Sequence, residues 1–407
     1  MGFFDKMFGT KTNSGKIAAE AQAGDFVTAL LMHLRGELEP ALSAYQKIAE
    51  EFPEDTLAPF FAAAIRSDTG KAVEAADGLR SLSRRIAAAG EAISRAISLD
   101  LVSLVSDEPF LKVKGIPAVA DIIVSFGDSL KQSGFVQESA VCFEIAAGLV
   151  PEHANVLYKL GDTLHDLGIY DYAESVLLEA LKHAPSHWGA LYTYAVLLQD
   201  LGRDEEAITY YGRAVRLIPD HVNSQNNYGA ALLRANRLEE ALVHCTLAAN
   251  YDPDSPLVKI NLGNIYLLMQ EYETARTCFT EAISLNDKLA QAYFGLGSVE
   301  QRSGSDTGRI RELYLKAIQL NPSIPEIYQA VGNLFAGDGS PEALQYFSEA
   351  VQMNSNLKDL HKDFGMACLQ QGQRKEALEH LRMALQQNPD DVMVQNVLAG
   401  AEAENPV

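Results

Sequence analysis

Apolar residues recur along most of the chain with the period of about 3.6 residues that marks one face of an α-helix. They come in pairs of short segments, and a turn separates the two segments of each pair. One such pair consists of Leu191, Tyr194 and Leu198 followed by Ala207, Tyr211 and Ala214. Because a single helical hairpin cannot bury its own apolar face, neighbouring pairs must stack. The pattern predicts an all-α chain built from stacked helical hairpins.

The same pattern repeats at intervals of 34 residues. Small residues form a first column: Gly127, Gly161, Ala195, Gly229, Gly263, Gly297, Gly332 and Gly365. A second column contains Ala146, Ala180, Ala214, Ala248, Ala282, Ala317, Ala350 and Ala384. Both columns keep step through one single-residue insertion and one single-residue deletion, so chance does not explain them. The spacing predicts eight tandem repeats over residues 120–391, beginning near Ala120, Ala154, Trp188, Val222, Pro256, Ala290, Pro325 and Lys358.

These columns resemble the 34-residue tetratricopeptide repeat, which has a Leu-Gly pair, an aromatic residue, and then Ala, Ala and Pro at fixed places. The unit that starts at Val222 carries Tyr228-Gly229, Leu232, Ala241, Cys245, Ala248 and Pro253. The resemblance implies an α-solenoid, a right-handed superhelix of helix-turn-helix hairpins. It also implies that the first helix of each hairpin lines a concave groove that binds other proteins.

The flanking segments follow the pattern less closely. Residues 1–21 are expected to form a tail or short helix with Phe3, Phe4, Met7 and Phe8 on one side. We expect this segment to pack onto the first repeat or to fray, rather than to bind a membrane. Residues 22–119 comprise two degenerate repeats over 22–89, a connecting helix over 90–106, and a hinge in which 107–109 and 115–117 break the helices. Residues 392–407 supply a capping helix and a tail.

Charge and cysteine usage narrow the classes of partner. The chain has 33 Lys and Arg against 54 Asp and Glu, a formal charge of −21, which disfavours binding to nucleic acid. No stretch approaches 18 apolar residues, so no membrane span is expected. The four cysteines form no Cys-x-x-Cys pair, which argues against a disulfide framework and a structural zinc site. Together with an N-terminus that lacks a secretory signal, this predicts a cytoplasmic location.

We expect neither catalysis nor a bound cofactor or metal. Phosphate-binding, nucleophile-elbow and zinc-protease motifs are absent from the sequence. His153, His187 and His221 recur every 34 residues, but equivalent residues of stacked hairpins lie too far apart to share one metal ion, so we interpret them as turn residues. The cysteines fall on inner helix faces and are expected to be buried and inert.

The resemblance also places candidate groove residues on the first helices. We expect the partner-binding set to be Tyr158, Asp162, Asp166, Tyr192, Asp200, Asn223, Asn226, Asn227, Asn261 and Asn264. Asn227 and Asn261 fall where the superhelical region of protein O-GlcNAc transferases carries an asparagine ladder, here over two repeats only. An amide both donates and accepts, so it can hold a peptide backbone, although these residues could simply be solvated.

The tyrosines and aspartates of this set suit a peptide with a basic residue beside an apolar anchor, or they could merely keep the groove soluble. We therefore expect a protein-interaction scaffold or adaptor that binds an extended or helical segment of a partner protein. One alternative is a targeting or regulatory subunit of a separately encoded enzyme, such as a glycosyltransferase. Another is a self-assembling structural scaffold.

Overall fold

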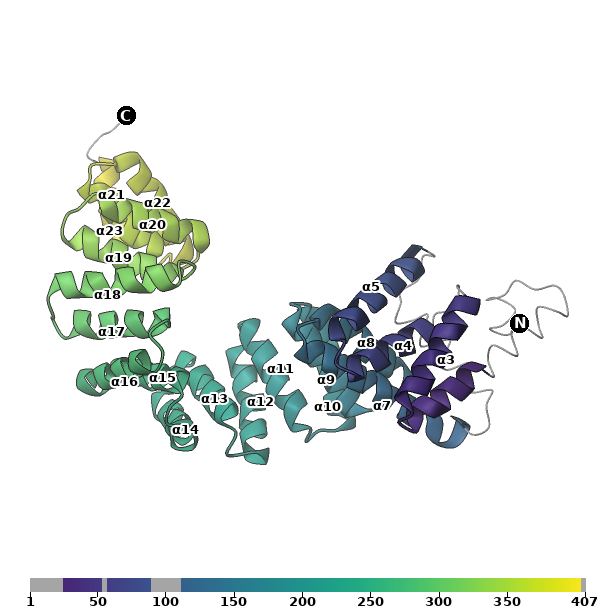
Figure 1. Ribbon diagram of the computed structural model, residues 1–407. Helices are drawn as coiled ribbons and strands as arrows, with labels where there is room; N and C mark the ends of the chain where they lie inside the picture. The colour runs from purple at the N-terminus through teal and green to yellow at the C-terminus, as the bar shows by residue number, and fades with distance from the viewer. Residues whose placement is uncertain (1–24, 53–56, 89–110, 404–407) are drawn as a thin grey trace. The chain divides into compact units, whose positions relative to one another are not determined.

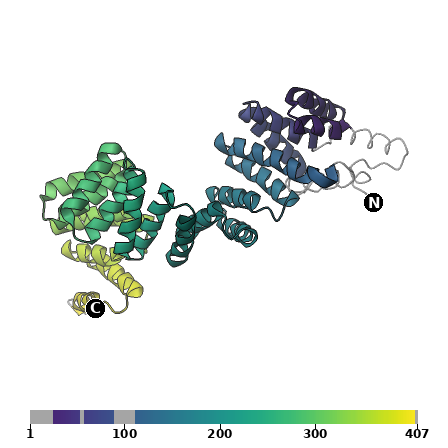
Figure 2. The ribbon, with the colours of Figure 1, turned by 90° about the horizontal axis from the view of Figure 1, so that it is seen from below.

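The structure is a computed structural model, and it describes residues 25–52, 57–88 and 111–403. The described residues form helices and turns without a strand, and consecutive helices pair as antiparallel hairpins. The chain divides into two compact units, residues 1–218 (unit 1) and 219–407 (unit 2). Both runs of hairpins can be followed in Figures 1 and 2. The expected all-α solenoid architecture is confirmed.

Unit 1 contains five described hairpins. The first joins a helix over residues 25–34 to α3 (Leu38–Glu51). The other four are α4 (Leu57–Asp68) with α5 (Ala72–Ala88), α7 (Leu111–Gln132) with α8 (Val136–Leu149), α9 (Ala154–Asp166) with α10 (Tyr170–His183), and α11 (Trp188–Asp200) with α12 (Asp204–Leu217). The helices α9 and α11 begin at the residues where the sequence repeats begin.

Unit 2 contains five further hairpins and a last, unpaired helix. The hairpins are α13 (Val222–Arg234) with α14 (Leu238–Tyr251), α15 (Pro256–Leu268) with α16 (Tyr272–Leu285), α17 (Ala290–Arg302) with α18 (Thr307–Leu320), α19 (Pro325–Gly337) with α20 (Glu342–Met353), and α21 (Leu360–Gln370) with α22 (Arg374–Gln387). The unpaired helix α23 (Val392–Ala403) packs on α22.

The turn inside each hairpin needs one residue in the left-handed conformation. Gly202 takes it between α11 and α12 with φ +74°. In the next two repeats Asn236 (φ +56°) and Gln270 (φ +63°) adopt the same conformation at the equivalent position. A left-handed Gln is strained, so the turn geometry is imposed there by the packing of the two helices.

Close contact between the two helices of a hairpin explains the glycine column. A Cβ built on Gly332 would lie 2.8 Å from the ring of Phe347, and one on Gly161 would lie 2.6 Å from Cγ of Leu177. Both partners come from the second helix and are buried. The small residue therefore lets a large apolar side chain cross directly over the first helix.

The first helices form the inner layer of each unit. In unit 1, α4 contacts α7 and α9 contacts α11, and in unit 2 α13 contacts α15, α15 contacts α17, and α19 contacts α21. Among the described second helices, only α5 and α8 approach one another to a comparable extent. Each stack therefore curves with its first helices on the concave side, where the candidate residues lie.

Two boundaries differ from those expected. The residues Gly115, Ile116 and Pro117 were predicted to break the helix, but α7 runs through them. Pro117 costs this helix only one backbone hydrogen bond near its N-terminus, and continuity with the apolar face that follows outweighs that cost. The last complete hairpin begins at Leu360 rather than near Lys358, because Asp359 is left-handed (φ +60°). The predicted helix over 90–106 and the N-terminal tail lie outside the described residues.

Candidate partner-binding surfaces

The predicted groove residues divide between the two units. Tyr158, Asp162 and Asp166 lie on α9 and Tyr192 and Asp200 on α11, both in unit 1. The five asparagines lie on α13 and α15, in unit 2. We call these the tyrosine–aspartate surface and the asparagine surface. The structure therefore brings the residues together as two sets, each on neighbouring first helices.

Both tyrosines of the tyrosine–aspartate surface are half-buried. Tyr158 packs on the next first helix, α11, and Tyr192 packs within α11 itself. The ring of Tyr158 lies against Gly189 of α11, where a Cβ would come within 2.7 Å, and its centroid is 5.0 Å from that of His187. Tyr192 stacks on Trp188 with centroids 5.6 Å apart and planes 6° apart. Burial, followed by the nearby carboxylate of Asp162, raises the pKa of both hydroxyls. They remain neutral, partly exposed aromatic faces.

The aspartates of this surface have partners on neighbouring first helices. Lys131 of α7 places its Nζ 2.6 Å from Oδ2 of Asp162 and 2.8 Å from Oδ2 of Asp166. Thr193 of α11 donates to Oδ1 of Asp162 at 2.9 Å. Burial lowers the pKa of Lys131, but the hydrogen bonds that it donates to both carboxylates outweigh burial and raise that pKa. Lys131 therefore stays charged and holds the two carboxylates in place.

Sequence reasoning missed these partners. Besides Lys131, Lys159 lies 2.6 Å from Asp128, and Nε2 of His165 lies 2.7 Å from Oδ2 of Asp200. The two residues of each pair are separated by 31 or 35 residues along the sequence. These separations differ from the 34-residue repeat by less than one helical turn, so the paired side chains lie on neighbouring first helices. Complementary side chains at that spacing are the signal that could have revealed them. The aspartates are thus paired within the chain, yet their side chains stay 32% to 44% exposed.

The asparagine surface contains one direct amide pair. Nδ2 of Asn261 on α15 donates to Oδ1 of Asn226 on α13 at 2.9 Å. Asn226 is buried, Asn227, Asn261 and Asn264 are half-buried, and Asn223 is exposed. The contact joins Asn226 and Asn261, whereas the two residues at the expected ladder positions are Asn227 and Asn261. Amides of two successive first helices therefore lie side by side on this surface.

Apolar and cationic side chains extend the asparagine surface. Leu257 and Leu268 of α15 are 56% and 48% exposed, and Phe294 of α17 is half-buried with its ring 5.5 Å from that of Tyr314. Arg302 at the end of α17 is exposed. The two surfaces differ in chemistry, because one carries carboxylates and the other amides, leucines and an arginine.

The predictions for histidine and cysteine can be compared with the structure. His187 and His221 precede α11 and α13, and their Nδ1 atoms accept backbone N–H bonds from Ala190 and Ser224 at 3.1 Å. Cys142, Cys245, Cys278 and Cys368 are buried, and burial raises the pKa of each thiol. Within residues 25–52, 57–88 and 111–403, no group of three or more His, Cys, Asp or Glu could hold a metal ion. Nor is any helix there long and apolar enough to cross a membrane.

Three sequence profiles of one family match the chain. All are described as tetratricopeptide repeat, and they match residues 124–187, 167–221 and 192–256, residues 256–289, and residues 341–400. Together these ranges cover more than half of the chain. The chain belongs to the tetratricopeptide repeat family. Tetratricopeptide repeat proteins are generally non-catalytic scaffolds for protein interaction. Membership in the family supports this general role for the chain.

A comparison with solved structures matched several tetratricopeptide repeat proteins. YrrB, described as a TPR protein with an unusual peptide-binding site, is 22% identical, with a TM-score of 0.35 over 46% of this chain and 96% of YrrB. A tetratricopeptide repeat protein from Parabacteroides merdae is 17% identical, with a TM-score of 0.49 over 61% and 98%. MamA from Desulfovibrio magneticus is 22% identical, with a TM-score of 0.38 over 42% and 96%. A search of curated proteins found no match.

Proposed function

We propose that the chain is an adaptor whose two concave surfaces bind extended segments of a partner protein. The observation that carries the proposal is that the tyrosine–aspartate surface is held in place by contacts within the chain and is still exposed. Its aspartates are fixed by in-chain partners and their side chains are still 32% to 44% exposed, beside two half-buried tyrosine rings. Groups held in place before binding lose little conformational entropy when a ligand arrives.

The charge of the tyrosine–aspartate surface favours a basic segment. Four carboxylates, those of Asp128, Asp162, Asp166 and Asp200, share this surface with the ammonium groups of Lys131 and Lys159. The surplus of negative charge attracts a Lys or Arg, while the tyrosine faces accept an apolar or cationic side chain next to it. The segment bound here would therefore carry a basic residue beside an apolar one.

The asparagine surface would hold the main chain of the segment. Asn226 is buried and holds the amide of Asn261 in place, and Asn261 and Asn264 of α15 are half-buried, so their amides would bond to the segment. Amides that bond to peptide N–H and C=O groups give affinity without selecting particular side chains. The exposed leucines of α15 add apolar contact area next to them.

A triple variant tests this function. Substituting Asn227→Ala, Asn261→Ala and Tyr192→Ala should weaken capture of the partner at least about tenfold, which corresponds to about 1.4 kcal/mol. The far-ultraviolet circular dichroism should stay helical. The matched control replaces Leu178 and Val243, exposed residues of the second helices α10 and α14, by Ala. Capture by the triple variant that equals capture by this control would contradict a role of the concave surfaces.

One observation favours self-association as a second function. Within the part of the chain that the structure describes, no further helix follows α23 to pair with it, and Val392 and Met393 are 64% and 56% exposed there. Two copies could bury these faces against one another. Light scattering should then show a molar mass that rises with concentration, and the variant Val392→Asp with Met393→Asp should remain monomeric. A mass that is constant over the concentration range would remove this alternative.

A further inference from the structure

A second kind of surface lies on the opposite side of unit 1. Between the second helices α8 and α10 there is a cavity of about 430 Å³, which we call the α8–α10 groove. Ala140 and Val141 line one wall, Ile169 and Tyr172 the other, and Leu164 of α9 lies at the floor. Ile169 and Tyr172 are 47% and 42% exposed. The groove exists because α8 and α10 diverge on the convex side, while α9 packs against both.

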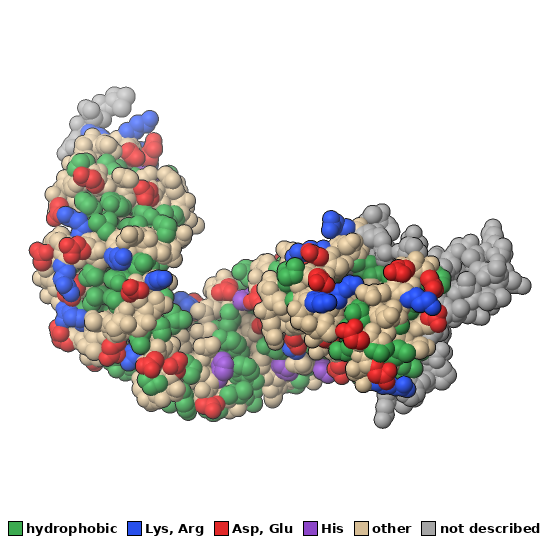
Figure 3. Space-filling model, viewed as in Figure 1, with side chains coloured by type: hydrophobic (Ala, Val, Ile, Leu, Met, Phe, Trp, Pro, Cys, Tyr) green, Lys and Arg blue, Asp and Glu red, His purple; other side chains and the backbone are tan. Residues whose placement is uncertain are grey.

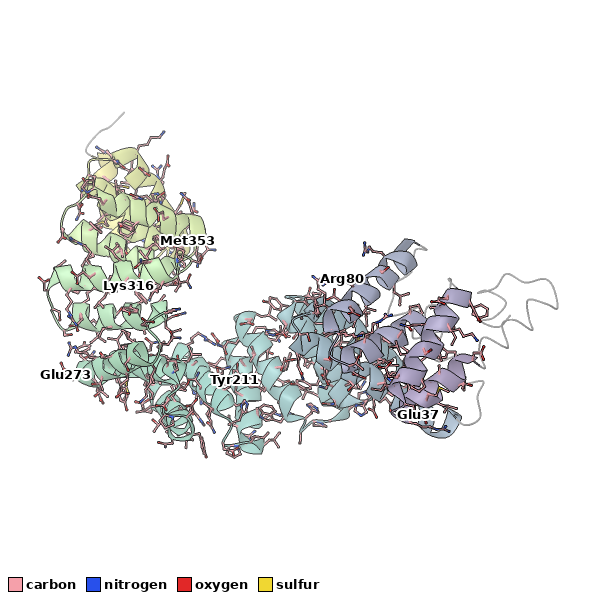
Figure 4. All side chains as sticks on the ribbon, in the orientation of Figure 1. Glu37, Arg80, Tyr211, Glu273, Lys316 and Met353 are labelled. Atoms are coloured by element: carbon pink, nitrogen blue, oxygen red, sulfur yellow. The ribbon has the colours of Figure 1, made fainter. Side chains whose placement is uncertain are left out.

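The α8–α10 groove is mainly apolar and open. Its polar groups lie at the rim, where the hydroxyl of Tyr172 donates to Glu144 across the opening at 3.4 Å. On the other side of α8 a second cavity of about 420 Å³ shares Val141 and reaches Leu79 and Arg80, the latter labelled in Figure 4. The exposed apolar side chains of the groove form a concave surface that another apolar segment can cover. The concave surfaces leave it unused, because they lie on the first helices.

We propose that residues 3–8 of the same chain cover the α8–α10 groove. Phe3, Phe4, Met7 and Phe8 have the spacing that places four large apolar side chains on one side of a helix. Three phenylalanine rings and a methionine suit an apolar cavity of several hundred cubic ångströms, and Met adapts to irregular apolar walls. Asp5 and Lys6 fall on the opposite side and would face solvent.

The connecting chain is long enough for this contact. The first described helix, residues 25–34, belongs to the same unit as the groove and is two hairpins removed from α8. The distance from the start of this helix to the groove can be estimated from the packing. At about 10 Å between packed helices, the two hairpins account for about 20 Å, and the length of one helix adds about another 20 Å. Residues 9–24 in an extended conformation span about 50 Å. Reach and apolar character together favour this segment over a separate partner.

Photo-crosslinking in the full-length chain tests the assignment. With benzoylphenylalanine in place of Phe4, irradiation at low micromolar protein should give intramolecular crosslinks to residues 137–144 and 169–172. The substitution Ile169→Asp should lower their yield about tenfold. It should not harm folding, because Ile169 is the N-cap residue of α10 and Asp is a favourable N-cap.

The matched control is Val243→Asp on α14, which is 56% exposed and should leave the yield unchanged. Equal loss of yield in both variants would show a general effect of negative charge and overturn the proposal. Crosslinks that form only between two copies would assign the groove to a second molecule, and crosslinks to other parts of the chain would place the segment elsewhere. Either result would also overturn it. None of these crosslinking results concerns the concave surfaces. The crosslinking test is therefore independent of the triple-variant test of the adaptor function.

Discussion

At the scale of single residues, the histidines at the starts of first helices act as N-caps. His187 and His221 accept backbone N–H bonds through Nδ1, which requires that nitrogen to be unprotonated. Burial lowers the pKa of both imidazoles, and it lowers the pKa of His33 to about 4. The recurrence of these histidines every 34 residues thus reflects a structural role at two of the three positions.

This role predicts a loss of stability in weak acid. Because the folded-state pKa values of these histidines lie below the unfolded value of about 6.5, the unfolded chain binds more protons as the pH falls. The contribution is fully present above pH 6.5 and is lost below it. Urea unfolding should therefore give a lower free energy of unfolding at about pH 5 than at about pH 7.5.

The variant His187→Asn isolates one cap. Asparagine caps a helix without titrating in this range, so the difference between the two pH values should shrink, while His187→Ala should cost about 1 kcal/mol at pH 7.5. A pH difference that is the same in His187→Asn and in the unsubstituted chain would exclude the capping explanation.

At the scale of elements, the crossing of two helices in a hairpin decides where glycine is required. A Cβ at Gly332 would meet the buried ring of Phe347, whereas one at Gly400 of α23 has nothing within 4 Å. Both glycines are helical. Helix propensity alone would favour alanine at either position, so the difference between them measures packing.

The two substitutions should therefore have opposite signs. Gly332→Ala should lower the free energy of unfolding by about 1–3 kcal/mol because the ring cannot move aside within its core. Gly400→Ala should raise it by about 0.5–1 kcal/mol. Thermal and urea unfolding followed by circular dichroism provide the measurement. Stabilisation by both substitutions would refute close packing at the crossing.

The sequence predicted these crossings well, because a column of small residues every 34 positions follows from packing alone. It predicted α7 poorly, since Gly115 and Pro117 break helices in isolation and only the tertiary contacts of α7 override them. On the candidate surfaces the positions could be predicted, but the partners of Asp162 and Asp200 could not. Those pairs join different repeats, and side-chain reach across a stack is not visible in a helical pattern.

At the scale of the whole molecule, the chain divides into two compact units. The largest core cluster runs from Phe26 to Val156 in unit 1, and the clusters between Ile260 and Val394 belong to unit 2. Figure 3 shows acidic and basic side chains interspersed on the visible face, without a continuous field of one sign. In repeat proteins stability comes mainly from contacts between neighbouring hairpins.

Unit 2 should therefore fold by itself. Residues 219–407 produced alone should give a helical circular dichroism spectrum and a cooperative thermal transition. A spectrum without helical bands, or a transition without a sigmoidal shape, would show that unit 2 depends on unit 1. Size-exclusion chromatography separates this outcome from aggregation.

The central claim is that a partner segment lies on the concave surfaces of the first helices. It is tested most directly by benzoylphenylalanine placed one position at a time at Val196 of α11, Ala230 of α13, Leu178 of α10 and Val243 of α14, with the crosslinked partner peptide identified by mass spectrometry. We expect partner adducts from Val196 and Ala230 and none from Leu178 and Val243. Adducts from the two second-helix positions alone would contradict the account.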